Sequence, residues 1–285
     1  MNRAFFHGLK VVAQQKAEAL LLDLFPGAAA AFSLRKLRSD YTGAAIRVRR
    51  SSDNAEQDFT ATEITDGTLT TFCGAGDGFV SVWYNQGSGN DAVQNTASNQ
   101  PKIVDDGVVV KDNGKPAIKF DGTNDFMSVS HSADLNFTAD NELSISLVTN
   151  PKAQTNNFPR LLSKFGSINN RYNILVPTNP SAYTFAGSDN QVSFQDPVVY
   201  NGNLKIITAM LLDGAAKGFI DENQVINETV NLGFTTNTAD LRIGDRVGLD
   251  RNYAGDISEL IIWNQDKSGV YNSISNNIND HYAIY

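Results

Sequence analysis

The chain has 285 residues, 41% of them hydrophobic and 19% charged, with a net charge of −8 and a pI of about 4.9. This length fits one large all-β domain with an appendage, and the acidic balance excludes nucleic acid as a general partner because phosphate backbones are also anionic. Cys73 is the single cysteine, so no intrachain disulfide forms, and no sequence pattern pairs a histidine with it as in a catalytic thiol. We expect Cys73 to be a small buried side chain in a strand.

Residues 1–27 carry an apolar stripe with helical spacing that includes Leu9, Val12, Leu20 and Leu24 and ends at a Pro-Gly pair. The polar face holds acids as well as lysines and has no tryptophan, which disfavours a membrane-surface helix. The segment lacks the continuous apolar run of a signal peptide, and no part of the chain reaches the length of a membrane span. We therefore expect a helical docking segment, packed on its own domain, on a sister subunit of a homo-oligomer or on another protein.

The elements that follow change from helical to strand periodicity. The alanine-rich stretch 28–37 predicts a second helical piece with a basic end. From residue 43 the period is two, and Ile46 and Val48 alternate with arginines. Short β-rich runs separated by glycine and asparagine turns then recur at 79–84, 117–120, 126–129, 143–147, 172–176, 182–185, 205–212, 218–221, 224–226, 241–243 and 257–263. Residues 268–282 predict a short C-terminal helix.

Many short strands without intervening helices are typical of a β-sandwich or jelly roll. The predicted fold is therefore an antiparallel jelly-roll β-sandwich over residues 28–285, preceded by the N-terminal helical docking segment 1–27. No internal repeat, linker or low-complexity tract divides this range, so we expect a single β-domain.

Charged and aromatic side chains supply further candidates. Arg47, Arg49 and Arg50 lie close in sequence to three acids, which favours an internal salt-bridge network over an anion clamp or a partner-docking surface. Both tryptophans lie within apolar strands and are expected in the core. Tyr253, in a polar loop, is the best candidate for an exposed ring that stacks on a sugar, with Tyr183 and Asp245 as further carbohydrate-binding candidates.

Two stretches resemble known families. The first stretch contains the run Tyr41-Thr42-Gly43-Ala44-Ala45-Ile46-Arg47-Val48-Arg49-Arg50 and the turn Trp83-Tyr84-Asn85-Gln86 … Gly89-Asn90-Asp91. It resembles the opening of the catalytic domain of α-L-arabinofuranosidase B, and the resemblance is clearest over residues 28–125. The second resembles the closing strands of laminin G and pentraxin-like domains, a member group of the concanavalin A-like folds; it contains Leu212-Asp213-Gly214 and Gly255-Asp256-Ile257 … Trp263. The resemblance implies the same jelly-roll architecture for both.

The arabinofuranosidase resemblance also implies where catalytic carboxyl groups would lie, since a retaining glycosidase needs two of them. Asp189 would take the place of the nucleophile and Asp245 that of the acid. The chain departs from the family because no Glu stands near residue 189, and aspartate is one methylene shorter. We therefore expect no catalytic residues and a protein that is not an enzyme, with a glycoside hydrolase of the arabinofuranosidase type as the alternative.

Related sandwiches hold Ca²⁺ at a loop edge through oxygen ligands, and Asp125, Asp245 and Asp250 have the right chemistry for such a site. Ordinary turn hydrogen bonds are the competing explanation for these acids. The same arabinofuranosidase-like opening is met in proteins of tailed bacteriophages. The resemblance therefore implies a virion-associated structural protein, assembled in the host cytoplasm, that contacts other virion subunits through its N-terminal helix and binds cell-surface glycans for adhesion.

Overall fold

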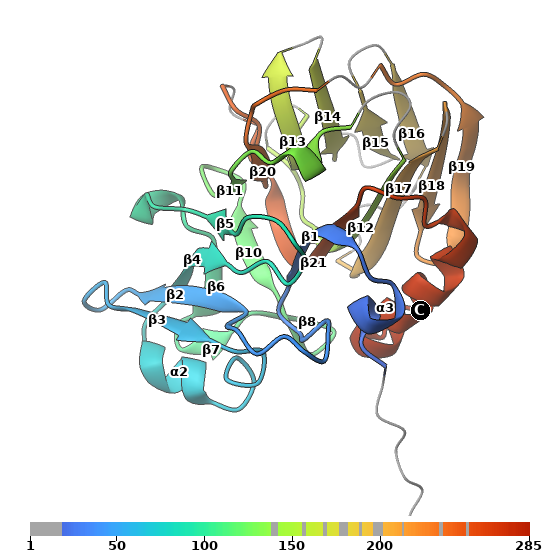
Figure 1. Ribbon diagram of the computed structural model, residues 1–285. Helices are drawn as coiled ribbons and strands as arrows, with labels where there is room; N and C mark the ends of the chain where they lie inside the picture. Colours follow the sequence, from blue (N-terminus) through green and yellow to red (C-terminus); the bar gives the residue numbers. More distant parts are fainter. Residues whose placement is uncertain are drawn as a thin grey trace, which may run out of the picture.

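The computed structural model describes residues 19–137, 142–155, 158–167, 170–176, 182–187, 190–195, 202–212, 214–233, 236–248 and 251–285. Almost all of the regular structure is antiparallel β-strand, arranged as a sandwich (Figure 1). The predicted jelly-roll sandwich and short C-terminal helix are confirmed. None of the helices in the described ranges is long and apolar enough to cross a bilayer.

One sheet, called here the front sheet, contains seven strands that pair in the order β5, β11, β20, β13, β14, β15 and β16. Its strands are β5 (Ala92–Val93), β11 (Met127–Val129), β13 (Arg160–Ser167), β14 (Asn170–Leu175), β15 (Ala182–Ala186), β16 (Gln191–Gln195) and β20 (Leu241–Ile243). Four of these correspond to predicted runs, whereas β5, β13 and β16 were not predicted.

The back sheet is built around β21, which pairs with β1 and β10 on one side and with β12 on the other, and continues through β17 and β18 to β19. Its strands are β1 (Ala28–Ser33), β10 (Ile118–Asp121), β12 (Leu143–Pro151), β17 (Lys205–Leu212), β18 (Ala215–Ile220), β19 (Asn223–Thr229) and β21 (Ala254–Trp263). Each strand from β10 to β21 in this sheet overlaps a predicted run.

A smaller group of strands joins the two sheets, because β4 pairs with β5 of the front sheet and, through β6, with β10 of the back sheet. The group contains β2 (Ile46–Arg50), β3 (Glu56–Phe59), β4 (Gly78–Trp83), β6 (Lys102–Asp105) and β7 (Val108–Val109), with the separate hairpin β8 (Lys111–Asp112) and β9 (Lys115–Pro116). The short helix α2 (Thr68–Cys73) lies beside it (Figure 1). Cys73 is buried as predicted, but in this helix and not in a strand.

The main hydrophobic core fills the space between the sheets and includes Trp83, which is fully buried. A second apolar cluster lies on the outer face of the back sheet, where Trp263 and Val148 pack against α1 (Leu21–Leu24) and α3 (Tyr271–Tyr282). The indole nitrogen of Trp263 donates to the carbonyl oxygen of Phe25 at 3.1 Å. The prediction that both tryptophans belong to the core is confirmed.

The prediction of a second helix over residues 28–37 is wrong. Residues 28–33 form strand β1, which pairs with β21 from Ala28 opposite Trp263 to Ser33 opposite Glu259. Ala28 and Ala31 contact the outer cluster, whereas Ala30 and Phe32 contact the main core. Because both faces are buried, the hydrophobic run has no strand-like alternation, and tertiary packing overrides the helix propensity of alanine.

The structure describes only the end of the predicted docking segment. Leu9 and Val12 lie outside the described residues, and the described part contains a single short helix, α1, of four residues. Leu21 is buried against the outer cluster, whereas Leu24 is 51% exposed. Residues 20–24 are therefore fixed to the domain, and the docking role of the segment stays a prediction.

The predicted salt-bridge network beside the first strands is confirmed. Arg47 contacts Asp58 across the β2–β3 pair at 2.7 Å, and Arg50 contacts Asp53 at 2.7 Å. Arg49 donates to the side chain of Gln100 at 2.7 Å. All three guanidinium groups have partners within the domain.

Candidate functional site

The face of the front sheet that points away from the hydrophobic core is polar. In the registers of these strands, Ser128 lies opposite Arg242, Arg242 opposite Ser163, and Ser163 opposite Asn173. The alternate positions hold apolar residues that belong to the core: Met127, Ile243, Leu162 and Ile174. Period-two alternation therefore gives the sheet one apolar and one polar face.

This polar face is partly covered. Ser163 and Asn173 are each only 1% exposed, and the hydroxyl of Ser163 donates to Oδ1 of Asn173 at 2.6 Å. On an uncovered sheet these side chains would contact solvent. Neighbouring groups therefore cover this part of the polar face of the front sheet.

Four arginines whose charges act on one another lie at this site, and we call them the arginine cluster. Arg160 comes from β13, Arg171 from β14, and Arg246 and Arg251 from the loop between β20 and β21. Arg242 of β20 lies on the same face of the sheet, where the charge of Asp245 reaches it. The backbone N–H of Arg160 donates to the carbonyl oxygen of Arg251 at 2.9 Å, which connects β13 to this loop. Chain topology, and not sequence proximity, brings the cluster together.

Burial and repulsion between neighbouring guanidinium groups determine the electrostatics of the cluster. Arg160 is only 6% exposed. Burial, followed by the positive charges of Arg246, Arg251 and Arg171, lowers the pKa of Arg160 to about 9, and Asp245 opposes the shift. Positive charge is therefore concentrated in a place where water screens it weakly.

Aromatic rings hold several of these guanidinium groups. The guanidinium carbon of Arg246 lies 3.5 Å from the ring centre of Phe165, and that of Arg242 lies 4.1 Å from that of Phe126. Both distances are within the range of cation–π contacts. Stacking on one face leaves the N–H edges of a guanidinium group available for a ligand.

Phe158 provides an exposed ring at the edge of the cluster. Its side chain is 57% exposed, and its ring centre lies 5.7 Å from the guanidinium carbon of Arg251. Arg160 donates a hydrogen bond from Nη1 to the carbonyl oxygen of Phe158. The φ angle of Phe158 is +54°, a left-handed conformation that is unusual for a bulky residue and recurs at functional sites. An exposed ring beside hydrogen-bond donors is the arrangement that stacks on a sugar.

Two predicted carbohydrate-binding residues are not exposed. Tyr253 is fully buried, and its hydroxyl shares a 2.7 Å hydrogen bond with Oγ1 of Thr149. Tyr183 is also fully buried, in the main core. The prediction that Tyr253 presents an exposed ring is wrong, because the residue packs against Phe120 at a ring-centre distance of 6.3 Å and does not extend from its polar loop.

Among the predicted acids, Asp245 lies at the arginine cluster and is 9% exposed. Asp189 and Asp250 lie outside the described residues. The distance between the two candidate catalytic carboxyl groups is therefore not part of the described structure. Asp245 is a buried carboxylate whose charge acts on Arg160, Arg242 and Arg246.

The predicted Ca²⁺ ligands do not form a group among the described residues. Asp125 is buried and accepts a hydrogen bond from the backbone N–H of Asp121 at 2.9 Å. In the described ranges, three acids come close enough to share an ion only at Asp77, Asp105 and Asp106. Lys102 already lies 2.9 Å from Asp77 and 2.8 Å from Asp105, so its ammonium group offsets part of the negative charge of that cluster.

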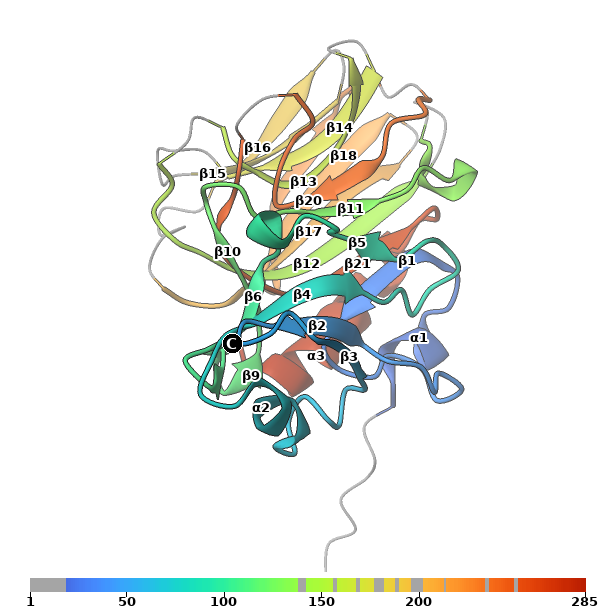
Figure 2. The same ribbon diagram turned by 90° about the vertical axis from the view of Figure 1, so that its left-hand side faces the viewer.

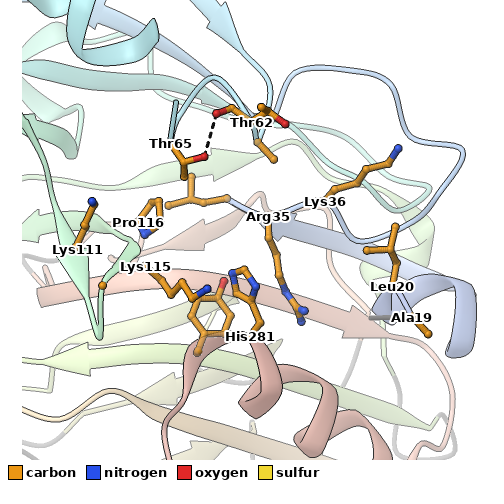
Figure 3. A pocket seen from close by; sticks show the side chains of 14 residues that line it. Ala19, Leu20, Arg35, Lys36, Thr62, Thr65, Lys111, Lys115, Pro116 and His281 are labelled. Carbon is orange, nitrogen blue, oxygen red and sulfur yellow. Dashed lines mark hydrogen bonds between the residues drawn. The ribbon is translucent and has the colours of Figure 1, made fainter. Parts of the chain in front are cut away.

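A separate cavity of about 550 Å³ lies where the described chain begins (Figure 3). Leu20, the β8–β9 hairpin and the end of α3 contribute to its walls, and its cationic side chains are Arg35, Lys36, Lys111 and Lys115. Figure 3 shows Lys115 beside His281. Burial, with the charges of Arg35 and Lys115, lowers the pKa of His281 to about 4, so this imidazole is neutral at pH 7.

The sequence offered one signal for the residues that were missed. Five of the eleven arginines fall between residues 160 and 251, and none falls between residues 51 and 159. This signal is weak, because nine acids lie in the same range of the sequence. It also does not show that strands β13, β14 and β20 are neighbours. Phe158 carries no signal, because a single exposed aromatic residue cannot be told from a core residue by sequence alone.

Comparisons with known proteins agree with this fold. A laminin G-type model described as the concanavalin A-like lectin/glucanases superfamily matches residues 121–269. Among solved structures, an arabinofuranosidase complexed with arabinofuranosyl-α-1,2-xylobiose gives a TM-score of 0.70, and a GH54 α-L-arabinofuranosidase soaked with a cyclic sulfate inhibitor gives 0.71. Each is 14% identical to the chain, and the match covers 90% of this chain and 64% of the other. A search of curated proteins found no match.

At this level of identity, the likeness to the arabinofuranosidases establishes the fold alone. The chain also spans less than two thirds of the length of those enzymes. The architecture expected from the two resemblances is confirmed, while activity and partners are matters for the next subsection.

Proposed function

Because the chain belongs to the concanavalin A-like lectin/glucanases superfamily, we propose that it is a glycan-binding adhesion module of a bacteriophage virion, as a tail or capsid decoration or fibre component. The observation that carries the glycan-binding part is the exposed ring of Phe158 beside the arginine cluster on the polar face of the front sheet. Sugars present apolar C–H faces and hydroxyl edges, so a ring next to several N–H donors matches both. The virion part rests on the resemblance of residues 28–125.

The arrangement of the molecule supports adhesion. Figure 2 shows β14 and β16 at one end of the molecule and α1 with α2 at the other. The arginine cluster and Phe158 belong to the first end, whereas the N-terminal segment joins the domain at the second. A protein docked through residues 1–27 to another virion subunit would therefore direct its glycan site outward.

The glycan-binding part is tested on a glycan array with the purified full chain, in the presence of Ca²⁺ and of a chelator. We expect reproducible binding to a restricted set of glycans, and we expect Phe158→Ala to reduce it at least tenfold because stacking on an aromatic ring is lost. Leu24→Ala, which alters an exposed apolar residue at the other end, is the control. An array without signal for the wild-type protein would contradict the proposal, and loss of binding in chelator would place a cation at the site.

The docking part needs a separate test on assembled particles. We expect deletion of residues 1–18, which leaves the fixed residues of α1 in place, to remove the protein from purified virions while leaving its thermal unfolding unchanged. The control is Val108→Ala in the otherwise full chain, which alters one exposed apolar side chain outside residues 1–27 and keeps the segment. Retention of the truncated protein on the particle would show that other surfaces dock it.

A glycoside hydrolase is the second candidate function, favoured by the position of Asp245 at the polar site and by the arabinofuranosidase fold. Hydrolysis requires a second carboxyl group within about 5–10 Å of Asp245, depending on whether configuration is retained or inverted. Turnover of an aryl α-L-arabinofuranoside that disappears in Asp245→Asn would establish it. Binding without turnover would leave the adhesion function.

A further inference from the structure

The cavity where the described chain begins is lined by positive charge. Its volume is about 550 Å³, and four of its lining side chains are cationic: Arg35, Lys36, Lys111 and Lys115. Among the described residues that line it there is no aspartate or glutamate. Figure 3 shows Lys36 and Lys111 at opposite sides, with Lys115, Arg35 and His281 between them. Positive charge is thus concentrated in one cavity of a protein whose net charge is −8.

Most of this charge has no counter-charge within the described part of the chain. Arg35 forms an ion pair with Glu259 at 2.8 Å and is therefore balanced. Lys36, Lys111 and Lys115 form no ion pair with any described acid. The ammonium group of Lys36 donates to a backbone carbonyl oxygen at 2.9 Å, which supplies no full negative charge. Three ammonium groups are therefore left to attract an anion.

The imidazole of His281 shows the effect of this charge on the cavity. Burial, followed by the positive charges of Arg35 and Lys115, lowers its pKa to about 4, and Glu259 opposes the shift. The ring packs edge-on against that of Tyr282, with 4.6 Å between the ring centres. At pH 7 the neutral ring offers one N–H donor and one acceptor. A hydrogen-bond donor therefore lines the same cavity as the three ammonium groups.

The kind of cation favours a phosphate over a carboxylate. Two-pronged recognition of a carboxylate needs the edge of a free guanidinium group, but Glu259 occupies Nε and Nη2 of Arg35 at 2.8 Å and 3.1 Å. Lysine ammonium groups act as separate point charges, and they bind phosphate in that way. A phosphate monoester carries about −1.5 to −2 charges at pH 7, so it offsets more of the lysine charge than a singly charged carboxylate does.

The cavity also has room for the group that carries the phosphate. Its volume is within the range of about 300–1,000 Å³ that is usual for small-molecule sites. Leu34 and Pro116 supply apolar wall, while Thr62 and Thr65 supply hydroxyl groups. A sugar ring has an apolar face and hydroxyl edges, so it matches both kinds of wall.

Charge disfavours the protein's own N-terminal residues as the occupant. The cavity includes Ala19 and Leu20 in its walls, so residues 1–18 join the domain beside it. These residues contain three lysines or arginines and one acid, Glu18. A segment with net positive charge is repelled by the lysines of the cavity.

From these observations we propose that this cavity is a phosphate-monoester site that binds a sugar phosphate. Lys111 and Lys115 of the β8–β9 hairpin would contact the phosphate oxygens, and His281 would donate its N–H to one of them. Figure 2 shows β9, α1 and α3, whose ends lie around the cavity, away from β14 and β16 of the front sheet. The site is therefore separate from the proposed glycan site and does not depend on it.

The test compares three probes of similar shape and different charge: glucose 6-phosphate, glucose 6-sulfate and glucose. Their binding to the full chain is measured by isothermal titration calorimetry near neutral pH at two salt concentrations. We expect the doubly charged phosphate to bind more tightly than the singly charged sulfate by about tenfold or more, and glucose to give no signal. Higher salt should weaken phosphate binding, because salt screens the lysine charges.

Variants of the hairpin test the residues. Lys111→Ala and Lys115→Ala should each lower the affinity for glucose 6-phosphate by about fivefold, since each removes one partly exposed charge. Lys115→Arg keeps the charge and should keep most of the affinity. Lys217→Ala, which removes a half-buried lysine of β18 outside the cavity, is the matched control and should change nothing. Thermal unfolding verifies that each variant is folded.

The imidazole of His281 provides a second readout, followed by NMR as a function of pH. Bound phosphate offsets the charges of Arg35 and Lys115, so glucose 6-phosphate should raise the pKa of His281. Equal affinity for the phosphate and the sulfate, unchanged affinity in both alanine variants, or an unmoved pKa of His281 at saturation would overturn the proposed site. So would the absence of binding by all three probes. The glycan array tests the other end of the molecule, so the two proposals fail independently.

Discussion

Replacement of Glu259 by alanine is expected to lower the free energy of unfolding by about 3–5 kcal/mol. Glu259 lies on β21 and is 1% exposed. Its Oε2 accepts hydrogen bonds from the hydroxyl of Ser33 and from Nε of Arg35, both at 2.8 Å, and its Oε1 accepts one from Nη2 of Arg35 at 3.1 Å. Truncation would leave the Arg35 guanidinium, whose side chain is 10% exposed, without its counter-charge in a weakly screened environment.

Urea unfolding, followed by the fluorescence of the two buried tryptophans, measures this loss. The matched control is Asp58→Ala, which breaks an equally short ion pair with Arg47 that is 40–45% exposed and should cost less than about 1 kcal/mol. In the double variant Arg35→Met with Glu259→Leu, apolar side chains replace both charges. It should be less destabilised than the two single effects added together. A loss from Glu259→Ala no larger than that from Asp58→Ala would show that burial does not strengthen this pair.

The strands could be predicted where one face is buried or where an apolar run is bounded by turns. Ile46 and Val48 alternate with arginines, and the register places both in the core opposite β4. Strand β1 was not predicted because Ala28 to Phe32 are buried on both faces, so their sequence shows no alternation of apolar and polar residues. Strand β13 was not predicted because the buried Lys164 interrupts its apolar run. The Lys164 ammonium group donates a hydrogen bond to the carbonyl oxygen of Asn237 at 3.1 Å.

The candidate site was harder to predict than the fold, because it depends on pairing between distant strands. Asp245 was identified through the family resemblance, and it lies at the arginine cluster. Arg160 and Arg246 are far apart in sequence, and the pairing of β13 with β20, which precedes Arg246, brings their charges together. The prediction of an exposed Tyr253 was wrong because a polar loop sequence does not exclude a side chain that points into the core. The Tyr253 hydroxyl shares a hydrogen bond with Thr149.

The stability of the domain should fall as pH rises from about 4 to about 7, and Asp125→Asn should remove this effect. Burial, followed by the charge of Asp121, raises the pKa of Asp125 to about 7 from an ordinary value of 3.8. The unfolded chain loses this proton near pH 4, whereas the folded chain keeps it to about pH 7. The contribution of Asp125 to stability is therefore fully present below pH 4 and is lost as pH rises to 7. One pKa unit corresponds to about 1.4 kcal/mol, so the total loss is on the order of 4 kcal/mol.

Asparagine stays neutral at every pH and keeps an oxygen that accepts the Asp121 N–H, so Asp125→Asn should unfold at a higher temperature than the wild type at pH 8 and at a similar temperature at pH 4. The measurement is calorimetric unfolding across this pH range. Asp134→Asn, at an exposed position, controls for the loss of one negative charge and should leave the pH profile unchanged. If Asp125→Asn and the wild type lose stability in parallel between pH 4 and 8, another group carries the pH dependence.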